Sequence, residues 1–218
     1  HSRMRTSVFS EDYVLALPDD HERWLCGLSR QTREKLRYYQ RRSFRREPGL
    51  AFSVARGAEI TDDDVRSVLR LSRERMQQKG QTYGMSAAEE RQLLAQMREA
   101  GLLCALRIHG EICAGLLCTV AGTDIYMHVI AHDPRHDDLR PGLLCCCLCL
   151  RHAIGQGFAR FHFLWGHYDY KRRLGAMPVP LLRLLVWRSA ASAWRHPLLW
   201  VHWHGLCARD ALRRWRRT

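Results

Sequence analysis

Residues 102–120 have the sequence LLCALRIHGEICAGLLCTV, in which two apolar runs flank His109-Gly110-Glu111. A short, glycine-containing connection between two apolar runs predicts a β-hairpin. A second turn at Ala121-Gly122-Thr123-Asp124 leads into a third apolar run, residues 125–131. This stretch therefore predicts three consecutive antiparallel strands.

Downstream of these strands, helix and strand signals alternate. Pro141 follows a polar loop, residues 132–140, and proline is favoured at the first position of a helix. The predicted helix continues to about Ile154 and stops at Gly155-Gln156-Gly157. Beyond it we expect a strand over 160–165, a short helix over 168–174 and an irregular strand over 179–188.

Upstream of the hairpin, two helices are marked by capping residues. Thr61 precedes three aspartates, residues 62–64, which the positive end of a helix dipole favours. Ser86-Ala87-Ala88-Glu89 is a capping box, and Gly101 ends the second helix. A short strand over 50–56 precedes both helices.

Residues 20–46 predict one long basic helix, closed by Pro48-Gly49. The element order as a whole predicts an α/β fold with a mixed, mostly antiparallel sheet flanked by helices and preceded by this basic linker helix. The expected divisions are an N-terminal segment (1–19), the linker helix (20–49), the sheet-and-helix domain (50–188) and a Trp/Arg-rich helical tail (189–218).

The linker helix carries arginines at every fourth residue, which places them on one face. They are Arg33, Arg37, Arg41 and Arg45, called here the arginine stripe. Like charges at this spacing destabilise a helix by about 0.2–0.5 kcal/mol per pair. Two interpretations remain open, contact with an anionic ligand or partner and a solvated face.

The composition is that of a globular chain, with 46% apolar and 26% charged residues among 218. A formal charge of +13 indicates a phosphate-rich cofactor, nucleic acid or acidic membrane as partner, or else an inert basic surface. Apolar stretches are too short to span a bilayer. Nine cysteines and no secretory signal indicate a reducing cytoplasm, peripheral to the inner membrane if the tail binds lipid.

Four of the cysteines cluster at Cys145, Cys146, Cys147 and Cys149. Successive residues of a helix point about 100° apart, so these thiols cannot converge on one zinc ion. The histidines lack a metal-binding spacing such as H-E-x-x-H. We therefore predict apolar packing of the thiols against the sheet and no metal.

Four sequence pieces occur in a characteristic order. They are Leu28–Arg33 with the arginine stripe, Gly110–Gly115, Arg140–Leu144, and Phe163–Gly166 followed by Tyr170–Gly175. In this order they resemble the CelD-like family of GNAT-fold acyltransferases, which is associated with bacterial cellulose and exopolysaccharide biosynthesis. The likeness extends over roughly residues 13–188. Members of this family usually have another lobe ahead of the basic helix, so the chain is expected to be a piece of a longer protein.

The resemblance implies a CoA-dependent N- or O-acyltransferase that uses acetyl-CoA or another acyl-CoA, with a sugar or an amine as candidate acceptor. GNAT enzymes typically hold the CoA pyrophosphate in a loop with the pattern Gln/Arg-x-x-Gly-x-Gly/Ala. The matching stretch here, residues 137–142, has one glycine and two acids, and Pro141 lacks a backbone donor.

The resemblance and the predicted helix start also give candidate binding residues. A diphosphate could lie at the helix N-terminus, with Arg135 and Arg140 beside it, although ordinary loop arginines are the alternative. The cofactor-binding candidates are Ile130, Ala131, Arg135, Arg140, Gly142 and Leu143. The substrate-binding candidates are Arg33, Arg37, Gly166 and Asp169.

For catalysis, the resemblance to GNAT enzymes suggests that Tyr170 protonates the departing CoA thiolate. Lys171 could stabilise negative charge in the transition state or hold a phosphate. Tyr168 is the rival acid and His167 the rival base. The alternative is structural, with Tyr170 packed under the sheet and Lys171 solvated.

Two other functions remain open at this point. Fem-type peptidyl transferases share GNAT lobes and use aminoacyl-tRNA, and their motif resembles the Tyr170-Lys171 pair near a glycine. The third alternative is a non-catalytic lobe that binds a membrane or a partner, because five of seven tryptophans lie in the tail region from Trp187 onward, with arginines near its end.

Overall fold

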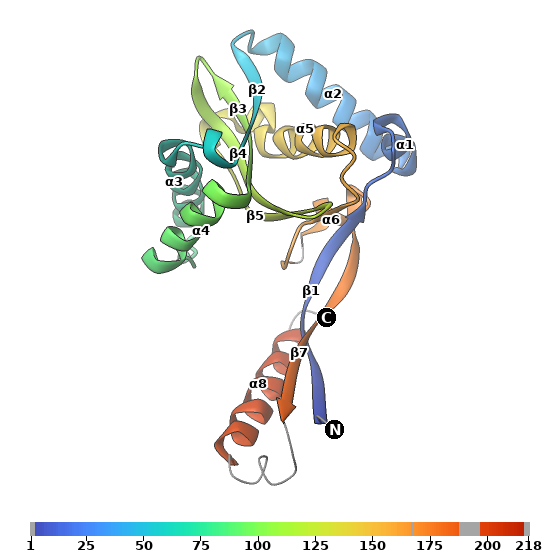
Figure 1. The fold of residues 1–218 in the computed structure, drawn as a ribbon. Coiled ribbons are helices and arrows are strands. Elements are labelled where there is room, and N and C mark those ends of the chain that lie inside the picture. The colour runs from blue at the N-terminus through green and yellow to red at the C-terminus, as the bar shows by residue number, and fades with distance from the viewer. Residues whose placement is uncertain (1–2, 167, 188–196, 216–218) are drawn as a thin grey trace.

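The computed structural model describes residues 3–166, 168–187 and 197–215, which form a seven-stranded open sheet with flanking helices (Figure 1). The strand order is β2-β3-β4-β5-β6-β1-β7. The strands are β1 (Arg3–Ala16), β2 (Leu50–Arg56), β3 (Gly101–Ile108), β4 (Glu111–Ala121), β5 (Asp124–His132), β6 (Arg160–His162) and β7 (Met177–Trp187). The helices are α1 (His21–Gly27), α2 (Arg30–Arg46), α3 (Asp62–Gln78), α4 (Ala87–Ala100), α5 (Pro141–Gly155), α6 (Asp169–Arg173) and α8 (Pro197–Trp215), with 3₁₀ turns η1 (Gly57–Glu59) and η2 (Pro134–Leu139).

The three antiparallel strands predicted at the start of the sequence analysis are confirmed as β3, β4 and β5. The β3–β4 turn places His109 at φ 50° and Gly110 at φ 90°, a left-handed pair that suits a tight hairpin. β5 and β6 run parallel and all other strand pairs are antiparallel, so the expected mixed, mostly antiparallel sheet is confirmed.

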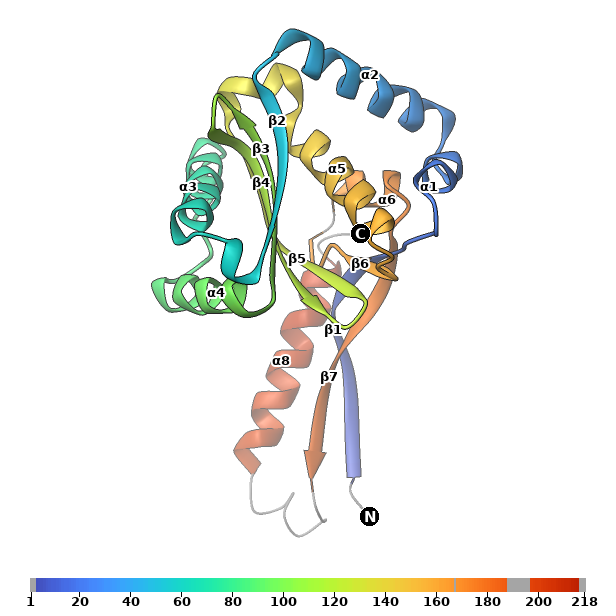
Figure 2. The ribbon, with the colours of Figure 1, turned by 45° about the horizontal axis from the view of Figure 1, so that its top comes forward.

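Helices cover both faces of this sheet, as Figure 2 shows. On one face, α5 packs over side chains such as Leu116 and Cys118. On the other face, α3 and α4 pack over neighbours such as Leu117. Because successive strand residues point to opposite faces, the central strands are buried on both sides.

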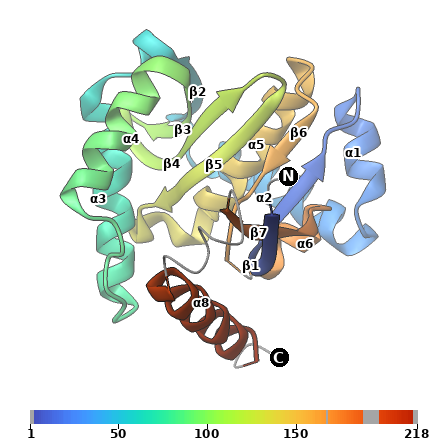
Figure 3. The ribbon, with the colours of Figure 1, turned by 60° about the horizontal axis from the view of Figure 1, so that its bottom comes forward.

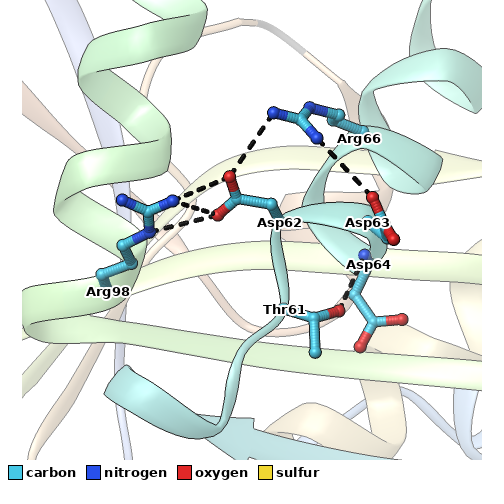
Figure 4. Close-up of polar contacts among 6 residues, drawn as sticks. All are labelled: Thr61, Asp62, Asp63, Asp64, Arg66 and Arg98. Carbon is cyan, nitrogen blue, oxygen red and sulfur yellow. Dashed lines mark hydrogen bonds and ion pairs between the residues drawn. The ribbon is translucent and has the colours of Figure 1, made fainter.

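Both predicted helix caps are confirmed. Thr61 accepts the backbone N–H of Asp64 at the start of α3, and Ser86 and Glu89 form the capping box of α4. Figure 4 shows that Asp62 also accepts from Arg98 of α4, with Arg98 Nη2 2.8 Å from both carboxylate oxygens. The acidic first turn therefore joins α3 to α4 as well as complementing the helix dipole.

The prediction of one continuous basic helix over 20–46 is wrong. Leu28 is extended, and Ser29 caps a second helix by accepting the N–H of Thr32. A serine side chain at this point competes for backbone N–H groups and favours a new helix start over continuation. The basic segment is thus a helical hairpin, α1–α2, which lies across α5 (Figure 1).

The N-terminal segment contains a strand that the sequence analysis did not predict. β1 pairs with β7 from Arg3 to Val14 and with β6 at residues 14–16. Together β1 and β7 form a two-stranded ribbon that extends away from the rest of the sheet, with α8 beside it (Figures 1 and 3). The start of the Trp/Arg-rich tail, residues 189–196, lies outside the described residues.

The cysteine cluster is part of α5 and lies in the core between this helix and the sheet. Cys145, Cys146 and Cys149 are fully buried and Cys147 is partly buried. The Cys145 thiol donates to the carbonyl of Cys104 at 3.4 Å. Burial raises the pKa of the Cys145 and Cys146 thiols, which keeps them neutral and suited to apolar packing.

Candidate functional site

A cleft of about 930 Å³ lies between α2, the end of β5 and the start of α5. Its lining combines apolar side chains with four cationic ones, Lys35, Arg75, Arg140 and Arg173, and one carboxylate, Asp137. Such a lining suits a ligand with both an anionic and an apolar part. The remaining lining residues are Ser29, Gln31, Thr32, Leu36, Tyr39, Ile130, His132, Gly142, Leu143, Tyr170 and Leu174.

The α1–α2 hairpin is held over this cleft at both ends. The indole of Trp24 donates to the carbonyl of Leu174 at 3.0 Å, and the Ser43 hydroxyl donates to the carbonyl of Leu139 at 2.9 Å. Both contacts are buried. Arg46 and Asp138 add an ion pair at 2.9 Å, so one of the two loop acids is already neutralised by α2.

The start of α5 offers backbone donors to the cleft. Leu144 N–H bonds to the carbonyl of Arg140, whereas the first-turn amides of Gly142 and Leu143 precede any intrahelical acceptor. Pro141 has no N–H to offer. Arg140 has φ 52°, and this left-handed conformation starts the helix. The free amides, the helix dipole and the nearby cations make this end of the cleft anion-binding in character.

β5 and β6 separate beside the same cleft. They pair only from Asp124 to Tyr126, opposite Arg160 to His162, although β5 continues to His132. The remaining backbone of β5, including cleft-lining Ile130, therefore has an edge that β6 does not cover. An edge of this kind can pair with an extended ligand that carries amides.

His132 lies at the floor of the cleft between a guanidinium and a carboxylate. Its Nε2 is 2.8 Å from Asp137 Oδ1, and its Nδ1 is 3.3 Å from Arg75 Nη1. Burial, followed by the charge of Arg75, lowers the pKa of the imidazole, so it is neutral at pH 7.

Tyr170 and Lys171 have opposite placements. Tyr170 lines the cleft and packs partly buried against Phe163, with ring centroids 6.1 Å apart. Burial raises the pKa of its phenol, so it is protonated at neutral pH. Lys171 is 1% exposed and does not line the cleft.

The Lys171 ammonium holds the loop that follows β6. It donates to the carbonyls of Phe163, Leu164 and Trp165 at 2.9–3.0 Å, which uses all three of its protons. Leu164 has φ 53°, an uncommon conformation for leucine that these bonds stabilise. Burial lowers the pKa of Lys171 to about 8. The alternative in which Lys171 is solvated is therefore wrong, and its proposed role toward negative charge or a phosphate stays a prediction.

The other described residues proposed near the catalytic pair lie at the end of this loop and the start of α6. Tyr168 is 53% exposed, Asp169 forms an exposed ion pair with Arg173 at 3.7 Å, and Gly166 adopts φ 103°. His167 lies outside the described residues. None of these three described residues lines the cleft.

Two of the proposed cofactor residues also point elsewhere. Ala131 is buried in the part of the core that lies between the sheet and helices α3 and α4. Arg135 makes several hydrogen bonds to Asp133. Ile130, Arg140, Gly142 and Leu143 do line the cleft. The six residues proposed for the cofactor are thus divided between the cleft and its supporting structure.

Three of the four arginines in the arginine stripe have partners within the α1–α2 hairpin. Arg33 donates to the carbonyls of Leu25 and Cys26 at the end of α1, and Arg37 pairs with Glu22 at 2.9 Å. Arg41 Nε donates to the carbonyl of Arg37. The like-charge repulsion predicted for this face is therefore reduced by an acid and by backbone carbonyls.

Several cleft residues were missed by the sequence analysis, namely Lys35, Tyr39, Arg75, His132 and Arg173. Lys35 and Tyr39 follow the helical spacing of Leu36 on α2, and this spacing could have indicated them. Arg75 and His132 have no such signal, because only the packing of α3 against β5 brings them together.

An open mixed sheet whose parallel strands part beside an anion-binding helix start defines a GNAT-type transferase fold. The profile of the acetyltransferase (GNAT) domain family matches residues 30–172, and the chain belongs to this family. A comparison with curated proteins gives no match.

Solved structures share the fold at low sequence identity. FemX superposes with a TM-score of 0.68 at 11% identity, covering 88% of this chain and 67% of that chain. The C-terminal DUF2156 domain of a protein assigned as a lysylphosphatidylglycerol synthetase from Agrobacterium fabrum gives 0.57 at 16%, covering 88% and 64%. L-PGS from Bacillus licheniformis gives 0.56 at 16%, covering 87% and 64%. The chain thus spans less than two thirds of these two synthetase chains.

Proposed function

We propose that the chain is the transferase lobe of an enzyme that moves an acyl group from a CoA thioester to an amine or hydroxyl acceptor. The observation that carries this proposal is the cleft, in which the amides of Gly142 and Leu143 and four cationic side chains lie beside the parted edge of β5. Acetyl-CoA or a longer acyl-CoA is the proposed donor.

The two ends of the cleft suit the two ends of such a donor. The diphosphate would bind at the start of α5, where the helix dipole and Arg140 favour negative charge. The pantetheine arm has two amides and would run along the uncovered edge of β5 near Ile130. The thioester would then lie toward Tyr170, because Tyr170 lines the same cleft from α6.

In the reaction, the acceptor nitrogen or oxygen attacks the thioester carbonyl and forms a tetrahedral intermediate. The C–S bond then breaks, the thiolate takes the proton of the Tyr170 phenol, and the acceptor's own proton passes to solvent. The Tyr170 phenol is protonated at neutral pH and therefore has the proton that this step needs. Holding donor and acceptor together supplies much of the acceleration.

Calorimetry on the full chain tests the donor directly. Acetyl-CoA, longer acyl-CoAs and aminoacyl-tRNA are titrated in parallel at two salt concentrations. Saturable binding of the CoA species supports the proposal, and binding of tRNA alone would contradict it.

A second candidate donor is aminoacyl-tRNA, and the α1–α2 hairpin is the observation that favours it. Its exposed face combines arginines with Tyr38, which is 51% exposed, and Phe44, which is 38% exposed. Basic side chains interleaved with aromatic ones suit a nucleic-acid backbone and its bases. Under this reading tRNA affinity should fall steeply with salt, as phosphate contacts release counterions.

The narrower CelD-like likeness, with a role in exopolysaccharide or cellulose assembly and a sugar as acceptor, rests on the sequence motifs. The membrane- or partner-binding role of the tail is likewise a proposal from composition. No helix in the described part of the chain has the length and hydropathy that crossing a bilayer requires.

A further inference from the structure

Three side chains from three separate elements meet beneath the first turn of α5. Arg75 comes from the last turn of α3, His132 from the end of β5 and Asp137 from η2, and all three line the cleft. The imidazole lies between the other two, 3.3 Å from Arg75 Nη1 and 2.8 Å from Asp137 Oδ1.

The partners of the ring determine its tautomer. A guanidinium has only donors, so His132 Nδ1 must accept from Arg75. A carboxylate has only acceptors, so His132 Nε2 must carry the proton and donate to Asp137. Because the two partners have opposite requirements, the neutral Nε2–H form satisfies both, and Asp137 fixes the ring that orients Arg75.

The same ring lies under the helix start that offers backbone amides. A Cβ added at Gly142 would lie 2.7 Å from His132 Nδ1, so residue 142 packs directly on the imidazole and must be small. The guanidinium of Arg75 and the amides of Gly142 and Leu143 are therefore placed around one side chain. Two kinds of anion-binding group thus lie close to His132.

We propose that His132 is a positioning residue that holds Arg75 as a ligand for the diphosphate of the donor. The inference rests on the proposed function, because it assigns the phosphate end of that site. The arginine from α3 would supply the interactions that the loop at residues 137–142, with one glycine and a proline, does not. His132 itself touches Arg75 and need not touch the donor.

A pair of amide substitutions separates the two contacts of the ring. His132→Asn places an amide oxygen near the Nδ1 position and keeps an acceptor for Arg75. His132→Gln places its amide near the Nε2 position, so it keeps a donor to Asp137 but loses the acceptor. Arg75→Ala removes the guanidinium, and Arg70→Ala is the matched control, because Arg70 is exposed on the same helix and does not line the cleft.

Calorimetry with CoA and with inorganic diphosphate gives the readout, and thermal unfolding checks that each variant folds. Arg75→Ala should weaken both ligands about 10–100-fold, the usual loss for a charge-assisted hydrogen bond. His132→Gln should weaken them about 10-fold, His132→Asn less than about 3-fold, and the Arg75→Ala/His132→Gln double variant no more than Arg75→Ala alone. Arg70→Ala and binding of pantetheine, which lacks the diphosphate, should be unchanged.

The results distinguish failure of this inference from failure of the proposed donor. If CoA binds and His132→Gln binds it as wild type does, the positioning role is wrong and the donor stands. Equal losses for His132→Asn and His132→Gln would also overturn the role, because they would indicate general disruption. If diphosphate shows the expected pattern but CoA does not bind, the donor is wrong and the positioning role stands. Binding of neither ligand to the wild-type chain would overturn both.

Discussion

In β4, the seven residues from Ile112 to Cys118 are all buried, whereas in β7 half-buried and exposed residues alternate from Leu181 to Trp187. Both strands are apolar and both lie in the same sheet. The difference is what covers them. β4 has α5 on one face and α3 with α4 on the other, while the ribbon of β1 and β7 has α8 beside it.

The two faces of the ribbon show what one covering helix does. On the α8 side, Arg183 pairs with buried Asp210 at 2.5 Å, and Trp187 meets Trp200 edge-on at 5.1 Å. On the other side, Leu182, Leu184 and Val186 remain 52–59% exposed. The comparison teaches that an apolar strand sequence specifies a strand, and that its contribution to stability depends on the layers packed against it.

The first prediction concerns chemistry, which the proposed function places entirely in the part of the chain outside β1, β7 and α8, called the lobe from here on. Tyr170→Phe should lower turnover by about 10²–10⁴-fold, because it removes the proposed proton donor and leaves the ring in place. Leu184→Ala, on the bare face of the ribbon, should leave turnover unchanged. Steady-state kinetics with the acyl-CoA that binds best provides the measurement, and Tyr168→Phe tests the rival acid. Full turnover by a folded Tyr170→Phe variant would remove this tyrosine from the mechanism.

A matched leucine pair tests the packing contrast. Leu116→Ala should destabilise the chain by about 2–5 kcal/mol, since it opens a cavity in a core covered on both faces. Leu184→Ala should change the free energy of unfolding by less than about 0.5 kcal/mol, because its side chain is already largely in water. Urea denaturation measures both. Similar losses for the two variants would show that the bare face is covered in solution.

Lys171 lies where the lobe meets the ribbon, because α6 leads into β7, and its substitution tests a buried contact between the two regions. Lys171→Met should cost about 2–3 kcal/mol, since it leaves the loop carbonyls without a donor. The pKa of Lys171 is lowered to about 8 from 10.5, so between those pH values the unfolded chain binds the extra proton.

The stability of wild type relative to Lys171→Met should therefore rise as pH increases from 8 to 10.5. Urea titrations of both proteins at several pH values measure this difference and cancel the contribution of other groups. A difference that stays flat or falls over that window would contradict a lowered pKa.

Asp210→Asn tests how firmly α8 is attached. Breaking its pair with partly exposed Arg183 should cost about 1–3 kcal/mol, less than for a fully buried pair, and the loss should be local to α8 and the ribbon. Hydrogen exchange should show faster exchange in α8 with protection of β3 and β4 unchanged.

Truncation after Ser189 should likewise spare the lobe and reduce binding to anionic vesicles. A drop in lobe protection would show the tail to be part of the core.

The smallest effect on stability is expected on the arginine stripe. Reversing Arg37 and Arg41 to Glu should change the free energy of unfolding by less than about 1 kcal/mol, since the Arg37–Glu22 pair is exposed. Binding of an anionic ligand or partner should weaken, with a flatter salt dependence. Unchanged tRNA and acyl-CoA affinities would make this face a solvated surface.

Local signals predicted much of the lobe. Thr61 and Ser86 mark their helices by side-chain bonds within four residues, and Gly110 marks a turn of two, so no distant partner is needed to recognise them. The break at Ser29 was also local, but the basic run around it hid the cap. Such features depend on hydrogen bonds that close within one turn of chain.

The missed features depend on partners far along the chain. β1 alternates apolar and polar residues weakly and is held by β7, more than 160 residues away. His132 is one of two histidines in the stretch 132–140, and its contact with Arg75 spans 57 residues. Neither spacing nor composition encodes such a meeting, so the floor of the cleft could be found only in the folded chain.

The burial of Lys171 has a consequence for the proposed function, in which the chain handles activated acyl groups. An amine with a pKa of about 8 is a far better nucleophile at neutral pH than an ordinary lysine, and thioesters acylate free amines without help. At 1% exposure, and with its protons bound to three carbonyls, this amine is closed to the donor. The two other lysines in the sequence, Lys35 and Lys79, are exposed, and all remaining formal positive side-chain charge is on arginine, which is not acylated in this way. Under the proposed function, self-acylation of lysine side chains should therefore be confined to Lys79 and cleft-lining Lys35, and should leave the loop after β6 intact.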